Sequence, residues 1–333
     1  MDENKMKSGG RGITVPTRSS ITFLQQLAHN RLYSLSLTVV LLIVLASVLW
    51  PQTFPRWENF TAVALNLSFD TIVAVGMMIL MISGAFDLSV GSVLGAAAGF
   101  SSLMLLNKVP IVLTILFALI VAMAFGFANG LIVAKIGVNP MITTLAMMGI
   151  GQGTMLMMTA DKFTLPPEFL VLGQETFLGI RIPFWIAMLI VIIFSVMVSK
   201  LSFFKRYYYI GGNERAARLS GIPVEKMKIL SFVLASALAG VAGILLTARM
   251  GGFMVTYGKG MELRVITAVI IGGASLKGGV GVVPGALLGT VFMALVNNIM
   301  IIANVSVYWQ QIIVGIILLG AVSIDVLLKK KAA

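Results

Sequence analysis

Long runs of apolar residues, separated by short polar segments, follow one another along almost the whole chain. An α-helix needs roughly 20 residues to cross the hydrocarbon core of a bilayer. The runs are residues 33–50, 60–82, 88–106, 111–133, 140–160, 182–200, 229–248, 263–275, 281–303 and 307–328. The eighth is too short to cross fully as a straight helix. The pattern predicts an all-α integral membrane protein with about ten transmembrane helices.

The composition agrees with this prediction. Only 11% of the 333 residues are charged, whereas a soluble domain carries roughly 25%. Hydrophobic residues make up 59% of the chain, and the mean hydropathy is +1.02. The chain has no cysteine, and its single histidine, His29, lies in the polar N-terminal segment. These observations exclude an ordinary soluble domain and give no basis for a thiolate or His-rich metal site.

The distribution of Lys and Arg predicts the orientation in the membrane. If the N-terminus is cytoplasmic, 17 of the 24 basic residues fall in cytoplasmic segments and 7 in external ones. Cytoplasmic loops are the ones enriched in Lys and Arg, so both termini are expected inside. The net charge of +12 then reflects topology and contact with anionic lipid rather than nucleic-acid binding.

This topology divides the chain into three parts, which are a cytoplasmic N-terminal segment 1–32, a transmembrane domain 33–328 and a basic cytoplasmic tail 329–333. The polar segment is long for a signal peptide, so the first apolar run is expected to be retained. The longest external loop is 161–181, where Pro166-Pro167 argues against a simple helix. The longest internal loop is 201–228.

Two segments resemble each other and predict an internal repeat. "SGAFDLSVGSVLGAAAG" (83–99) and "GGASLKGGVGVVPGALLG" (272–289) each place a Gly-rich break before a helix with glycine at every fourth position. Small residues at this spacing allow helix backbones to approach closely in lipid. The expected packing positions are Gly91, Gly95 and Gly99 in the first copy, and Gly281, Gly285 and Gly289 in the second. Glycine-rich turns also recur in membrane bundles without a repeat. Six spans separate the copies, so the repeat is expected to be parallel.

No catalytic motif is present. The chain lacks a Gly-x-x-x-x-Gly-Lys-Ser/Thr phosphate loop, a His-Glu-x-x-His metal motif, a Gly-x-Ser-x-Gly nucleophile motif and a ladder of arginines. We expect a transport protein without an ATPase site of its own and without catalytic residues.

The acidic residues within or near the apolar runs are Asp70, Asp87, Glu262 and Asp325. Asp70 lies within a span and must face protein or water. Asp87 and Glu262 either line a pathway or cap the helices that follow them.

Neutral polar residues suit a cavity for hydroxylated solutes, and they equally suit hydrogen bonds back to their own helix. Those among the apolar residues of 129–153 are Asn129, Asn139, Thr143, Thr144 and Gln152. The candidate pathway residues are Asp87, Ser89, Asn139, Thr143, Thr144 and Glu262.

"IGGNERAARLSGIPVEKMK" (210–228) concentrates charge in an otherwise apolar chain. Asn213 is a good N-cap and Gly221 a good C-terminal stop, so a short helix is expected over 213–220. Glu214 and Arg218 stand in the favourable order for an ion pair one turn apart. Eight residues cannot sustain a helix alone in water, so packing must hold it.

Several spaced motifs together resemble the inner-membrane permease of bacterial ribose-type sugar ABC importers. They are "SGAFDLSVGSVLG", "VNPMITTLAMMGIGQG", "IGGNERAARLSGIPVEKMKI", "GMELRVITAVIIGGASLKGGVGVVPGALLG" and "YWQQIIVGIILLGAVSID". The resemblance covers roughly residues 35–328. The family typically has Gly-Gly-Ile-Asp-Leu-Ser where this chain has Gly-Ala-Phe-Asp-Leu-Ser at 84–89, a difference that concerns the identity of the substrate.

The resemblance implies a bacterial inner-membrane permease that pairs with a second copy or a related permease. It also implies two cytoplasmic ATPase subunits, which bind the ATP and Mg²⁺, and a periplasmic sugar-binding protein. The cytoplasmic coupling segment is implied at Gly212, Asn213, Glu214, Ala216, Ala217, Arg218 and Gly221. An ion- or proton-coupled secondary transporter is the alternative function, with Asp70 or Asp87 as its titrating group.

Overall fold

The computed structural model describes residues 31–158 and 165–332, so most of the predicted N-terminal segment lies outside the described residues. Each predicted apolar run contains a helix. These helices are α2 (Arg31–Leu49), α3 (Trp57–Ile82), α4 (Val90–Leu106), α5 (Ile111–Leu131), α6 (Pro140–Leu156), α8 (Ile182–Lys200), α11 (Val224–Met250), α12 (Met261–Ile271), α13 (Val283–Ile302) and α14 (Val307–Ala332). A π-helical turn, η1 (Ile132–Ile136), extends α5.

Within the described part of the chain, seven helices are long and apolar enough to cross a membrane. They are α2, α3, α5 with η1, α8, α11, α13 and α14. The helices α4 and α6 have 17 residues each, and α12 has 11. The short eighth run therefore remains short in the structure. The total number of crossings stays a prediction.

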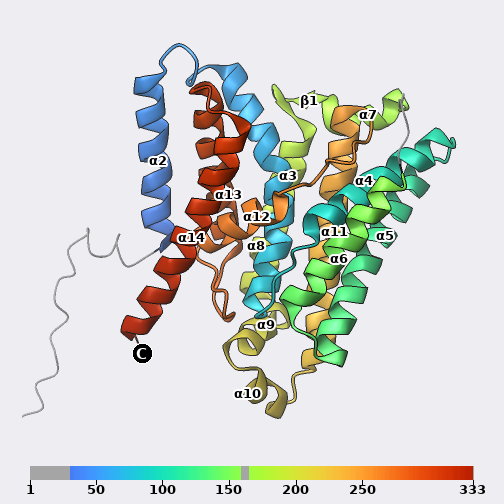
Figure 1. Cartoon of the computed structure of the whole chain (residues 1–333), viewed down its shortest axis with the longest axis vertical. Coiled ribbons are helices and arrows are strands. Elements are labelled where there is room, and N and C mark those ends of the chain that lie inside the picture. The colour runs from blue at the N-terminus through green and yellow to red at the C-terminus, as the bar shows by residue number, and fades with distance from the viewer. Residues whose placement is uncertain (1–30, 159–164, 333) are drawn as a thin grey trace, which may run out of the picture.

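The two predicted long loops lie at opposite ends of the helical bundle (Figure 1). The upper end holds α7 (Pro167–Gln174) and an antiparallel pair of strands, β1 (Thr176–Phe177) and β2 (Ile180–Arg181). The lower end holds α9 (Ser202–Gly212) and α10 (Glu214–Leu219). The expectation that Pro166-Pro167 prevents a simple helix was wrong locally, because Pro167 begins α7, where a proline lacking its N–H is well tolerated.

Helix α2 begins near mid-height and runs toward the upper end, whereas α14 runs down toward the end that carries α9 and α10 (Figure 1). This arrangement is compatible with both termini on one side of the membrane. Which side is cytoplasmic stays a prediction from the charge distribution.

The centre of the molecule is formed by α3, with α11 packed against α3, α4 and α5. In the apolar window of α3, 89% of the residues are buried, against 17% in α2 and 6% in α14. Small residues allow the close contacts. A Cβ on Gly126 of α5 would lie 2.6 Å from the Phe232 carbonyl oxygen of α11, and one on Gly130 would lie 2.7 Å from Ile229 Cα. Backbone proximity of this kind strengthens helix association in lipid.

The two similar segments adopt similar local structures. Helices α3 and α12 both end with a glycine at positive φ, Gly84 at +86° and Gly273 at +98°. In each case this glycine and the following alanine, Ala85 or Ala274, donate backbone hydrogen bonds of 3.0–3.2 Å to carbonyls of the last helical turn. This is the Schellman arrangement, for which glycine is preferred. The breaks also meet, because the Gly279 N–H donates to the Ile82 carbonyl at 2.9 Å.

The repeated glycines serve different contacts in the two copies. Gly285 and Gly289 of α13 face the backbone of α12, at the Gly272 and Ala268 carbonyls. Gly281 precedes α13, with φ of +154°, and lies beside α3.

In α4 the glycines at every fourth position lie against a loop, segment 251–260, and not against the backbone of another helix. A Cβ on Gly91 would meet the Gly258 carbonyl, and Gly95 and Gly99 face side chains of Met155 and Met158 together with parts of segment 251–260. The expected helix contact takes a different form here because that segment is inserted beside α4.

Candidate functional site

A hollow of about 210 Å³ lies between α4, α6 and the segment that leads into α12. Lining residues with polar side chains are Ser92, Gln152, Thr256, Tyr257, Lys259 and Glu262. Apolar side chains that also line it are Met148, Met155, Leu156 and Val255. Three segments far apart in sequence thus bring hydroxyl, amide, ammonium and carboxylate groups together among apolar helices.

Glycines shape this hollow. Gly258 and Gly260 have φ of +76° and +74°, a region that favours glycine, and they turn the chain into α12. Gly258 lies directly against Gly91 at the start of α4. Glu262 stands in the first turn of α12, and its Oε2 would lie 2.8 Å from a Cβ on Gly91. The close approach of these backbones places the Glu262 carboxylate beside α4.

Asp87 and Ser89 do not line this hollow and instead form a buried cluster with Asn129 of α5. The backbone N–H and hydroxyl of Ser89 donate to Asp87 Oδ1 at 2.7 and 2.6 Å. Asn129 Nδ2 donates to Asp87 Oδ2 at 3.2 Å and to Ser89 Oγ at 2.9 Å. The carboxylate accepts from Ser89, which precedes the first residue of α4, so it braces the break before α4 without capping the helix itself.

The predicted polar residues at the start of α6 lie away from the hollow. The Asn139 side chain caps α6 by accepting the Met141 N–H at 2.8 Å. Thr144 donates to its own helix, at the Pro140 carbonyl, at 2.9 Å. Thr143 Oγ1 is buried and lacks a hydrogen-bond partner within the described structure.

Sequence reasoning missed Ser92, Thr256 and Lys259 as lining residues. No motif marks them, because segment 251–260 looks like an ordinary loop between spans.

Asp70 of α3 faces the protein interior and pairs with Arg264 of α12. Arg264 Nε and Nη2 lie 3.3 Å from Asp70 Oδ2 and Oδ1, respectively, in a forked contact. The Asp70 carboxylate is therefore held by a guanidinium and does not line the hollow beside α4.

The predicted short helix is α10. The Asn213 side chain accepts the Ala216 N–H at 3.0 Å, and Asn213 is the N-cap. At the other end Gly221 has φ of +78°, and its N–H and that of Ile222 donate to carbonyls of α10, both at 3.1 Å. Both ends therefore use the residues that the sequence suggested.

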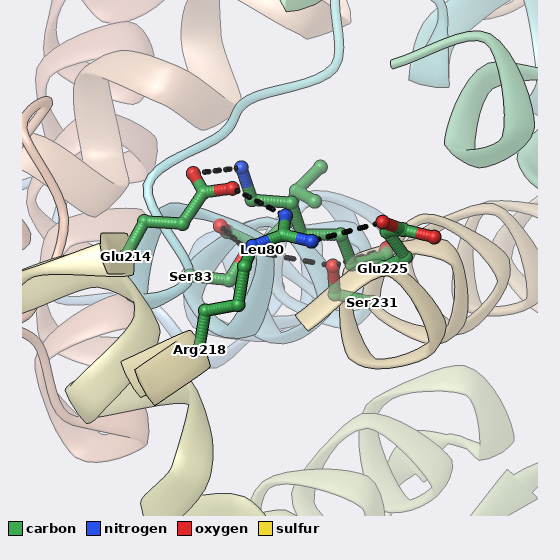
Figure 2. A network of polar contacts seen from close by, with 7 residues as sticks. Leu80, Ser83, Glu214, Arg218, Glu225 and Ser231 are labelled. Carbon is green, nitrogen blue, oxygen red and sulfur yellow. Dashed lines mark hydrogen bonds and ion pairs between the residues drawn. The ribbon is translucent and has the colours of Figure 1, made fainter. Parts of the chain in front are cut away.

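Ion pairs fasten α10 to the first turns of α11 (Figure 2). Glu214 accepts from Lys228 at 2.6 Å, and Arg218 lies 3.0 Å from Glu225 and 3.5 Å from Glu214. Partial burial acts to raise the pKa of Glu214, but the Lys228 ammonium and the Arg218 guanidinium outweigh it and hold that pKa below its ordinary value. The Glu225 and Glu214 carboxylates raise the pKa of Arg218.

The polar contacts continue from α11 to the end of α3 (Figure 2). Ser231 Oγ donates to the Lys228 carbonyl at 2.7 Å and lies 3.4 Å from Ser83 Oγ. Ser83 in turn donates to the Leu80 carbonyl at 2.7 Å. A continuous set of contacts thus connects α10 with the break that carries Asp87.

The residues of α10 differ in how far they are open to a partner. Ala217 is buried, with 4% of its surface exposed, and packs inside the chain. Ala216 and Ser220 are exposed, and Leu219 is 83% exposed. Because the helix turns Ala217 toward the protein, the surface open to a partner is centred on Leu219.

Comparisons with known proteins give a consistent result. Residues 59–322 match the family described as "Branched-chain amino acid transport system / permease component". The chain is 35% identical to the L-arabinose transport system permease protein of Escherichia coli over 299 residues, covering 87% of this chain and 89% of that protein. It is 34% identical over 301 residues to the ribose import permease protein of Bacillus subtilis, with 89% and 92% covered.

A third relative, the autoinducer 2 import system permease protein of Yersinia enterocolitica, is 28% identical over 303 residues, with 90% and 84% covered. No solved structure matches. The family match, the relatives and the apolar helices support the predicted resemblance and the location in the membrane. The chain therefore belongs to this family of importer permeases, on its ribose-type sugar branch, and is a multi-pass protein of the bacterial inner membrane.

Proposed function

We propose that this chain forms the membrane pathway of an ABC importer for a sugar or a sugar-like solute. A periplasmic binding protein delivers the solute, and separate ATPase subunits supply the energy. The names of the relatives, which are permeases for arabinose, ribose and autoinducer 2, support this substrate class. The ATPase role is assigned to partners because the chain has no phosphate-binding loop.

The hollow beside α4 is the observation that carries the proposal. Sugars present hydroxyl groups that donate and accept hydrogen bonds, and the lining contains matching groups on Ser92, Gln152, Thr256, Lys259 and Glu262. Met148 and Met155 add adaptable apolar contact for the faces of a sugar ring. We assign the passage of the solute to this hollow, in place of the sealed cluster around Asp87.

The helix α10 is proposed as the contact with the ATPase. Ion pairs link it to α11, and Leu219 offers an exposed apolar side chain at its end. Lys228 and Glu225 of α11 hold these ion pairs, so we expect a movement of α10 to act on α11 through them. This supports a role in coupling ATP hydrolysis to movement of the membrane helices.

A second permease copy, or a related permease, is proposed to pack beside α6. This helix borders the hollow and exposes Ile142, Leu145 and Ile150 on its outer side. Gly149 and Gly153 leave open space in which another helix can approach closely.

Reconstitution tests the proposed function. The purified chain is placed in lipid vesicles with its ATPase subunits and binding protein, and uptake of labelled pentoses, hexoses and polyols is measured. We expect uptake of at least one sugar that requires ATP and the binding protein and persists when ionophores remove the sodium and proton gradients. Uptake that needs an ion gradient and no ATP contradicts the proposal and supports the secondary transporter.

A matched pair of variants tests the hollow. Gln152→Ala removes an amide from the lining, whereas Thr154→Ala changes a nearby polar residue of α6 that bonds back to its own helix. We expect the first variant to slow uptake and the second to leave it unchanged. Equal rates in both variants contradict the assignment of the pathway.

A further inference from the structure

The short helix α12 carries two charged residues that point in different directions. Glu262 and Arg264 are separated by about 200° around the helix axis, since each residue turns it by about 100°. Glu262 lines the hollow beside α4, whereas Arg264 reaches Asp70 on α3. The first turn of α12 therefore carries both Glu262, at the hollow, and Arg264, in an ion pair on the opposite side of the helix.

Helix α12 depends on its neighbours for its position. It has only 11 residues, follows two glycines at positive φ, Gly258 and Gly260, and ends at Gly272-Gly273. The glycines at both ends allow the backbone to turn sharply into and out of α12. Buried side chains such as Val265 and Val269 then pack it among its neighbours. On one side it packs against Gly285 and Gly289 of α13, where the two backbones meet closely and no polar side chain of α12 is involved.

The forked ion pair adds a directional polar contact between α12 and α3 to this apolar packing. Both nitrogen–oxygen distances are 3.3 Å, and the side chains are partly enclosed, with 35% of Arg264 and 24% of Asp70 exposed. A cavity of about 50 Å³ beside the pair is lined by Asn66, Asn297 and Asn298. A fork of two parallel bonds constrains orientation more than a single point charge does.

The carboxylate is itself held in place. Asp70 lies within the long, mostly buried helix α3, and its neighbour Thr71 bonds to Thr290 of α13 at 2.8 Å. Helices α3 and α13 thus form a fixed base against which Arg264 sets α12.

We propose that Asp70 is a positioning residue, whose ion pair with Arg264 sets the rotation and depth of α12 and so holds Glu262 and Lys259 at the hollow. The functional part of this inference rests on the proposed pathway. The alternative is that the Asp70–Arg264 ion pair only stabilises the folded chain, since an unpaired charge at this depth is unfavourable.

The absence of cysteine from the sequence allows a direct test of position. Single cysteines replace Lys259, at the hollow, or Leu219, on the distant helix α10, and their reaction rates with a small neutral thiol reagent are measured in purified protein. We expect Asp70→Asn to change the rate at position 259 about threefold or more, as an altered local opening equilibrium does, and to leave the rate at 219 unchanged.

Two double variants separate position from stability. Exchange of the charges, Asp70→Arg with Arg264→Asp, restores the wild-type thiol rate at position 259. The apolar pair, Asp70→Leu with Arg264→Leu, restores the melting temperature without restoring that rate, because apolar contacts lack the direction of the fork. In the transport assay Asp70→Asn lowers sugar uptake per folded molecule about tenfold, as the loss of a supporting contact does at other sites.

The inference is overturned if Asp70→Asn lowers only the melting temperature or the yield and leaves the thiol rate at position 259 unchanged. It is also overturned if the apolar pair matches the wild-type rate. The thiol rates require no transport. A chain that shows the expected rates and carries no sugar therefore refutes the proposed function and supports the positioning role.

Discussion

Replacing Gly289 of α13 by alanine tests the close packing of α12 on α13. The added Cβ would overlap the Ala268 carbonyl of α12, which is backbone and cannot rotate away. Overpacking of this kind typically costs about 1–3 kcal/mol. Alanine is the better helix former by up to about 1 kcal/mol, which offsets part of this cost. Because the clash is with backbone, the cost lies near the upper end of that range, and the expected net loss is roughly 2 kcal/mol in the free energy of unfolding.

Gly315→Ala in α14 is the matched control. It is also a glycine-to-alanine change inside a helix, but no atom lies within 4 Å of the added Cβ. We expect Gly315→Ala to unfold at or above the wild-type temperature in detergent and Gly289→Ala to unfold below it. The readout is loss of the monodisperse peak in size-exclusion chromatography after heating. If the two variants melt together, the tight α12–α13 contact is not a source of stability.

Three further predictions address the ends and the centre of the molecule. The pKa of Glu214 lies below its ordinary value of 4.5, so its ion pair stabilises α10 above that pH and is lost as the pH falls through the lower pKa of the folded chain. Hydrogen exchange in α10, corrected for intrinsic rates, should therefore stay constant from pH 7 to 5 and rise below 4.5. A rise already near pH 6 argues against the ion pair. Glu168→Cys should react with an impermeant thiol reagent on intact spheroplasts, and Arg215→Cys only after permeabilisation; the opposite pattern inverts the topology. Asn129→Leu removes a buried donor to Asp87 and should cost about 1–3 kcal/mol in the free energy of unfolding, whereas an unchanged melting temperature would refute the bracing role of this cluster.

The helices were predictable because crossing a bilayer demands a long apolar run, which is visible in one dimension. Helix α10 was predictable for a different reason. Its N-cap, Asn213, and its C-terminal stop, Gly221, act on their immediate neighbours in the sequence. Hydropathy did not indicate α9 as a helix, because Lys205, Arg206 and three tyrosines interrupt the apolar run. Phe204 and Tyr207 are nevertheless three residues apart and are both buried on one face of the helix.

The hollow could not be predicted. Its lining comes from Ser92, Gln152 and the residues around Gly258, three segments that meet only after folding. The direction of Ala217 was missed for a related reason, since six residues of helix have no hydropathy pattern long enough to define an inner face. Asp70 was expected to face protein or water, but nothing in the spacing pointed to Arg264, 194 residues away.

The central claim is that α10 transmits the work of ATP hydrolysis to the sugar pathway. Leu219 is its most direct test, because this side chain is 83% exposed and its replacement leaves the packing of α10 intact. Leu219→Glu and the control Leu219→Met are reconstituted in vesicles with the ATPase subunits and the binding protein, and ATP-driven sugar uptake is measured per folded permease. The account predicts normal folding of both variants, uptake near the wild-type rate for Leu219→Met and its loss for Leu219→Glu. Wild-type uptake by Leu219→Glu would contradict it.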